Sequence, residues 1–129
     1  MKAAAVALVL GALYASIATG ATAASLTTDV EGVRVELSSA PEPPVKDRKT
    51  AYTVRLIDSG GKPITDARVT LTGRMPDGMS AAAPLRPVRE PGVYRGEVLF
   101  TMEGRWDLTV RVVRQAARLA ISVWEEVGR

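Results

Sequence analysis

Residues 91–112 read PGVYRGEVLFTMEGRWDLTVRV, and they contain two runs in which apolar and polar residues alternate. The apolar positions are Tyr94, Val98, Phe100 and Met102 in the first run, and Trp106, Leu108, Val110 and Val112 in the second. A period of two indicates strands with one buried face. Because Glu103-Gly104 is a short, Gly-containing connection between the runs, the pattern predicts a β-hairpin.

Five further segments complete an expected set of about seven short strands. They are residues 33–38, 50–58, 67–72, a short piece within 85–89, and 119–125. Between Gly73 and Glu90 the prolines and glycines predict a long loop that contains at most that short piece. Gln115-Ala116-Ala117 is either a turn or the start of a short helix. Short strands without a long helical insert predict an all-β fold, an immunoglobulin-like antiparallel β-sandwich.

The first 28 residues carry one charge, Lys2, and have the composition of an export segment. An Ala/Val/Leu-rich stretch is followed by small residues, which predicts a signal peptide over residues 1–23 with cleavage after Ala23. The alternative is an uncleaved membrane anchor through residues 3–24, since the uncharged stretch is long enough to span a bilayer. Residues 24–129 are then expected to form a single β-sandwich domain in the periplasm or elsewhere outside the cytoplasm.

The composition excludes several classes of function. The chain has no Cys and no His, so disulfides, Ser-His-Asp triads, Cys nucleophiles and conventional zinc or haem ligation are ruled out. Its 17 basic and 14 acidic residues leave a mild, scattered positive excess, which does not indicate a nucleic-acid partner. Two acids, Glu103 and Asp107, flank the expected turn, but acids beside a turn and an Arg are typical of a solvated surface. We therefore expect no catalytic residues and no enzyme activity.

The methionines are the candidate metal ligands. Met75 and Met79 lie in the motif MPDGM, and Met102 is the only other methionine after the export segment. Thioethers are soft ligands that favour Cu(I), so the three sulfurs together predict a weak copper(I) site. The alternative is that Met102 belongs to the core while Met75 and Met79 cover the end of the sandwich.

The two tryptophans have different expected roles. Trp106 falls on the inward face of its strand and is predicted to be core. Trp124 falls on the opposite face of the last strand from Ile121 and Val123. It is either an exposed contact residue or a side chain packed on the neighbouring strand.

Several short motifs between about Pro44 and Val112 resemble those of the FixH-like and YtkA-like exported domains. The motifs are Gly61-Lys62-Pro63-Ile64, Asp66-Ala67-Arg68-Val69, Met75-Pro76, Pro91-Gly92-Val93-Tyr94 and Met102-Glu103-Gly104-Arg105-Trp106-Asp107-Leu108. The resemblance implies a non-enzymatic envelope domain associated with respiratory-oxidase assembly and copper supply. It also implies an envelope or inner-membrane protein partner, and it favours the membrane-anchor alternative for residues 3–24.

Two functional hypotheses follow from these observations. The first is a periplasmic accessory domain that assists copper handling or oxidase assembly through Met75, Met79 and Met102. The second is an extracytoplasmic protein-interaction β-sandwich with no metal role, which binds through a sheet edge or through residues 73–90.

Overall fold

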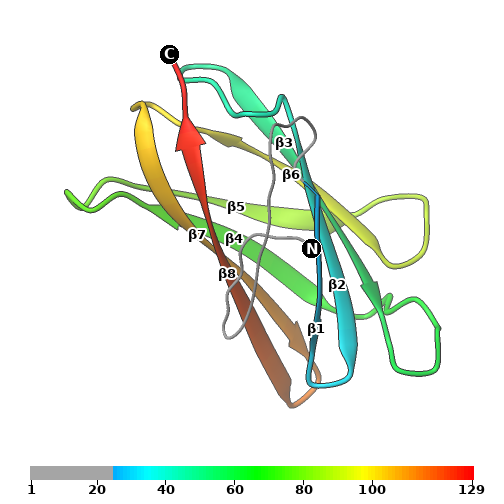
Figure 1. The fold of residues 1–129 in the computed structure, drawn as a ribbon. Helices are drawn as coiled ribbons and strands as arrows, with labels where there is room; N and C mark the ends of the chain where they lie inside the picture. The colour runs from blue at the N-terminus through cyan, green and yellow to red at the C-terminus, as the bar shows by residue number, and fades with distance from the viewer. Residues whose placement is uncertain (1–24) are drawn as a thin grey trace.

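The computed structural model describes residues 25–129, which form eight antiparallel strands and no helix (Figure 1). The strands are β1 (Ser25–Val30), β2 (Val33–Ala40), β3 (Lys49–Ile57), β4 (Arg68–Arg74), β5 (Ser80–Pro87), β6 (Val93–Leu99), β7 (Gly104–Arg114) and β8 (Ala117–Val127). The expected all-β sandwich class is confirmed. The predicted export segment, residues 1–23, and its anchor alternative lie outside the described residues. Over residues 25–129 the chain has no helix of the length and apolarity needed to cross a membrane.

The strands lie in two layers that share one strand. The hydrogen-bonded order is β1-β2-β3-β6-β5-β4-β7-β8. Residues 80–85 of β5 pair with β4, whereas Arg86 and Pro87 pair with β6 in the other layer. A strand that changes sheets in this way makes a corner of the sandwich. The two layers are therefore closed along the β5–β6 side and have free edges at β1 and β8.

The core lies between the layers and is built by the alternation that the sequence displays. In β3 and β7 every second side chain is buried and the others face outward. The aromatic centre consists of Phe100, whose ring centroid lies 5.0 Å from that of Trp106 and 6.4 Å from that of Tyr52. Trp106 is fully buried, which confirms its predicted core role.

The hairpin expected at Glu103-Gly104 is wrong. β6 pairs with β3 and β5, and β7 pairs with β4 and β8, so the two runs lie in opposite layers. Residues 100–103 cross between the layers, and the Phe100 carbonyl accepts a hydrogen bond of 2.8 Å from the amide of Asp47. Both edges of each strand are already occupied. The two alternating faces meet across the core and not along a shared edge.

Residues 73–90 do not form the long loop that was expected. β4 continues through Arg74, and β5 extends over eight residues, so only a tight turn separates them. Pro84 is accommodated because this part of β5 pairs with β4 alone and its other edge needs no N–H donor. β1 was also missed, since it directly follows the export segment and carries only Leu26 and Val30 as large apolar residues.

The end of the chain agrees with the sequence analysis. β8 is a strand, and the two residues Gln115 and Ala116 form its turn to β7. Gln115 has a φ of 53°, a value that suits the first position of a tight two-residue hairpin turn. The helical alternative is therefore excluded.

Candidate functional site

The turn between β4 and β5 carries two of the three candidate methionines. It is closed by a hydrogen bond of 2.8 Å from the Met75 amide to the Met79 carbonyl and by one of 3.0 Å from the Gly78 amide to the Met75 carbonyl. Gly78 has a φ of 99°, which favours glycine at this place. The Met75 side chain packs against the core, whereas 39% of Met79 is exposed. The turn therefore holds the two residues at one end of the sandwich with different accessibility.

The β6–β7 connection brings Met102 to the same end. A Cβ placed on Gly104 would lie 3.0 Å from the Cε methyl of Met75, so the Met75 side chain packs against this connection two residues from Met102. The carbonyl of Met102 accepts a hydrogen bond of 3.0 Å from the indole nitrogen of Trp106. The structure thus brings Met75 together with the segment that carries Met102, and Met79 terminates the same turn as Met75.

Met102 is not a core residue, contrary to the alternative raised from the sequence. It is 43% exposed, because β6 ends at Leu99 and Phe100 is the last inward side chain of the run. Beyond Phe100 the chain leaves the sheet, so the period of two no longer describes which side chains point inward. Two of the three thioethers are accordingly open to solvent.

The acids Glu103 and Asp107 lie in separate surface ion pairs. Glu103 is paired with Lys46 at 3.9 Å and with Arg129 at 3.2 Å, and Asp107 is paired with Arg105 at 3.3 Å. Each carboxylate has its own cationic neighbour, which is the arrangement of a charged surface and not of two cooperating acids.

A partly buried carboxyl cluster joins the two layers near the chain terminus. The hydroxyl of Tyr52 on β3 donates a hydrogen bond to Glu125 on β8, and Ser39 on β2 donates one of 3.1 Å to Glu42. Burial raises the pKa of Glu125 to about 7, the Tyr52 hydroxyl partly opposes this, and the nearby Glu42 carboxyl raises it further. Burial also raises the pKa of Glu42, against hydrogen bonds from Ser39 and Glu125. The pKa values of both carboxyls are raised, and that of Glu125 reaches about 7, so Glu125 stays largely protonated up to neutral pH.

The backbone of the same region forms a second link. The amide of Gly128 donates to the Pro44 carbonyl at 2.9 Å, and the Lys46 amide donates to the Gly128 carbonyl at 2.8 Å. We call these contacts, together with Glu42, Glu125 and Tyr52, the carboxyl clasp. The sequence contained one signal for it, since Glu125 continues the inward alternation of Ile121 and Val123; nothing local indicated that Glu42 would lie opposite.

Trp124 is the most exposed large apolar side chain of the described residues, at 52%. The guanidinium carbon of Arg105 lies 4.9 Å from its ring centroid, and Trp124 is paired across the strands with Asp107. This stacking on a neighbouring strand leaves the outer side of the ring free. Trp124 is therefore both exposed and packed against Arg105 of the neighbouring strand.

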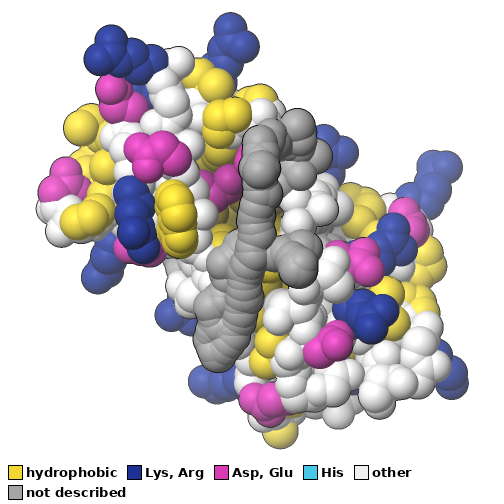
Figure 2. Space-filling model, in the orientation of Figure 1, with side chains coloured by type: hydrophobic (Ala, Val, Ile, Leu, Met, Phe, Trp, Pro, Cys, Tyr) yellow, Lys and Arg dark blue, Asp and Glu magenta, His cyan; other side chains and the backbone are white. Residues whose placement is uncertain are grey.

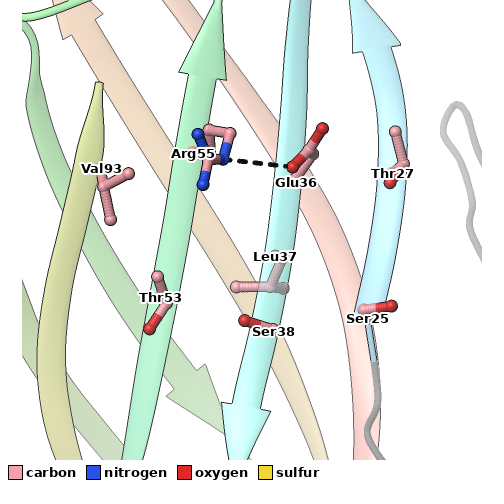
Figure 3. Close-up of a pocket in the computed structure, with 8 residues that line it drawn as sticks. All are labelled: Ser25, Thr27, Glu36, Leu37, Ser38, Thr53, Arg55 and Val93. Atoms are coloured by element: carbon pink, nitrogen blue, oxygen red, sulfur yellow. Dashed lines mark ion pairs between the residues drawn. The ribbon is translucent and has the colours of Figure 1, made fainter. Parts of the chain in front are cut away.

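A shallow depression lies on the outer face of the β1-β2-β3-β6 layer (Figure 3). Ser25, Thr27, Ser38 and Thr53 contribute hydroxyls, and Arg55 points toward Glu36, with which it pairs at 3.4 Å. Arg55 also pairs with Glu90 at 2.7 Å. Within the depression the charges of Arg55 and Glu36 neutralise each other, so it has little to offer a charged ligand. Figure 2 likewise shows basic and acidic side chains interspersed over the visible face, without a large area of one sign.

Comparisons with known proteins place this sandwich in a family. A family model described as YtkA-like matches residues 27–111. The chain belongs to the YtkA-like family. This confirms the YtkA-like part of the resemblance, and the matched region runs from β1 into β7 and ends before β8.

One solved structure supports the fold of this YtkA-like domain. A crystal structure of a DUF4426 family protein from Pseudomonas aeruginosa superposes with a TM-score of 0.64 at 16% identity, covering 81% of this chain and 94% of that chain. The Lin-41 filamin domain gives a TM-score of 0.49 at 20% identity and covers 72% of this chain and 92% of its own. No curated protein matches the sequence. The DUF4426 likeness shows a shared fold at this level of identity and nothing about activity.

Proposed function

We propose that this YtkA-like domain is a non-enzymatic accessory protein of the cell envelope that assists copper handling. Its ligands for Cu(I) would be the thioethers of Met75, Met79 and Met102. The observation that carries the proposal is the meeting of the β4–β5 turn and the β6–β7 connection at one end of the sandwich, with Met79 and Met102 exposed.

The chemistry of these side chains fits a transient site for a soft ion. Thioethers bind Cu(I) without becoming charged and without the ready oxidation of thiols outside the cytoplasm. The histidine-free and cysteine-free sequence offers no stronger ligand that would retain the ion. A bound Cu(I) would therefore be held weakly at the surface, as suits transfer to a partner.

The location and the partner form part of the same proposal. The N-terminal composition favours export, with cleavage after Ala23 or retention as an anchor. The family resemblance favours a role in respiratory-oxidase assembly beside an envelope or inner-membrane protein. Such a partner would bind at the end of the sandwich that carries the exposed Met79 and Met102.

A competition titration with a colorimetric Cu(I) chelator tests the metal site. We expect measurable Cu(I) binding by the wild-type chain and loss of that binding in the Met75→Leu/Met79→Leu double variant. Val88→Ala, at an exposed apolar position just beyond β5, is the control and should bind as wild type does. Absence of Cu(I) affinity in the wild type would end the copper proposal, and an unaffected double variant would end the ligand assignment.

The second candidate function is a protein-interaction module without metal. Two observations favour it: the exposed Trp124 and the free edge of β8 on which that residue lies. Crosslinking in the envelope followed by purification separates the candidates. A partner that is retained when Met75, Met79 and Met102 are all replaced by Leu needs no copper.

A further inference from the structure

β8 forms a long sheet edge. It contains eleven residues and no Pro or Gly, and it pairs only with β7. Directly beyond it, Gly128 pairs with Val45 of the β2–β3 connection, so the open part of the edge ends before Gly128. The other free edge, β1, has six residues. Natural sheets usually shorten or interrupt such edges, because unpaired backbone groups accept another strand. The edge of β8 is therefore suited to pairing with a further strand.

The hydrogen-bonding groups of this edge can be assigned from the hairpin. The two-residue turn at Gln115 and Ala116 closes on the pair Arg114–Ala117, which is the hydrogen-bonded type of pair. Odd-numbered residues of β8 consequently bond to β7. Even-numbered residues direct their N–H and C=O groups to the free edge. Their side chains point to the outer face, where all five are exposed: Arg118, Ala120, Ser122, Trp124 and Glu126. Arg105 of β7 stacks on the ring of Trp124.

These five side chains are complementary to themselves in the antiparallel direction. The charge is positive at one end and negative at the other, and a small and a large apolar residue flank the central Ser122. Among residues 25–129 neither Arg118 nor Glu126 takes part in an ion pair. Reversing the strand about Ser122 places each charge opposite its counter-charge.

We propose that two copies of this chain pair antiparallel through β8, about a two-fold axis at Ser122. Arg118 then lies opposite the partner's Glu126, and Ala120 lies opposite the partner's Trp124. The contact is isologous, so every interaction occurs twice. The β5-β4-β7-β8 layers of the two copies become one continuous sheet. This inference rests on the edge alone and is independent of the copper site.

The inner face of β8 supports the same register. Leu119 and Val123 are only partly buried against the core, since no strand covers them on the open side. In the proposed pairing Ile121 lies opposite the partner's Val123, which extends the apolar interior across the interface. Opposite-charge and aromatic pairs on the outer face add to this stabilisation.

Single cysteines test the register directly, because the chain contains no cysteine of its own. In a hydrogen-bonded antiparallel pair the Cα atoms lie about 5.5 Å apart, which is within reach of a disulfide or a short bis-maleimide linker. We expect Ser122→Cys in the full-length chain to crosslink to a second copy. Thr109→Cys, opposite Ser122 on the neighbouring strand β7, is the control and should remain uncrosslinked.

Charge reversal tests whether β8 of a second copy pairs with this edge, with Arg118 opposite the partner's Glu126. We expect Arg118→Glu or Glu126→Arg to weaken self-association about tenfold in sedimentation equilibrium, because two attractive pairs become repulsive. The double variant Arg118→Glu/Glu126→Arg restores the complementary pairs and should associate as wild type does. A merely structural defect would not be rescued in this way.

Three results would overturn the proposal. The first is a wild-type chain that remains monomeric at several hundred micromolar. The second is Ser122→Cys crosslinking to a different envelope protein and not to itself, which would assign the edge to that protein. The third is crosslinking of Ser122→Cys to itself together with a double charge variant that fails to recover association, which would contradict the proposed register.

Discussion

Gly96 shows how one residue permits the corner of the sandwich. A Cβ added there would lie 2.5 Å from the carbonyl oxygen of Pro84 and 2.6 Å from Cδ2 of Leu85. This is the point at which β5 leaves one layer and pairs with β6 in the other. The missing side chain is thus what lets the two strands approach.

Gly96→Ala should destabilise the fold by about 1 to 3 kcal/mol, the usual cost of overpacking, because the obstructing atom is backbone and cannot move freely. Urea denaturation of the variant and the wild type measures the difference. Gly60→Ala serves as the control, since its Cβ would meet only Asp58 Oδ1 at 3.4 Å and Gly60 has no positive φ. Equal stability of Gly96→Ala and wild type would contradict the close approach of β5 to β6.

At the scale of elements, the carboxyl clasp connects the β2–β3 connection to β8. The groups that face Glu125 are Glu42 from that connection and Tyr52 from β3, and no cation is paired with either carboxyl among residues 25–129. The folded-state pKa of Glu125, about 7, exceeds the ordinary glutamate value of 4.5. The protonated carboxyl is therefore the form that stabilises the folded chain.

The contribution of Glu125 to the free energy of unfolding should be complete below pH 4.5, should decline as the pH rises, and should be lost above about pH 7. We expect a loss of about 3 kcal/mol across that range from the size of the shift. Chemical denaturation at a series of pH values measures it. Glu125→Gln should remove this decline, while Glu97→Gln, an exposed acid on β6, should retain it. A decline that persists unchanged in Glu125→Gln would assign it to other groups.

At the scale of the whole molecule, β5 and the continuous core bind the two layers into one unit. Side chains from both layers meet around Phe100, and β5 has hydrogen bonds in each layer. Without disulfides, the layers are held together by packing, by the hydrogen bonds of β5 and by the carboxyl clasp. Neither layer has a separate hydrophobic core.

The two layers should consequently unfold in a single cooperative transition. In a Trp124→Phe background the fluorescence of the buried Trp106 reports on the core, and far-ultraviolet circular dichroism reports on all strands. We expect the two denaturation curves to coincide. Curves with different midpoints would show that one layer unfolds before the other.

Sequence alone determined the inward faces of the strands and the class of the fold. The alternation around Trp106, Val54 and Ile121 is local, because the strand itself sets the period of two. It also indicated the methionines as the soft donors and excluded cysteine and histidine chemistry. The family resemblance was visible in the same residues.

Only the tertiary structure decided which strands are neighbours. Residues 91–112 contain two true strands, yet they lie in opposite layers, because pairing depends on which edges other strands have already taken. The same holds for the opposition of Glu42 and Glu125 and for the free edge of β8. These features join segments far apart in the chain, and no local pattern records a contact whose partner lies eighty residues away.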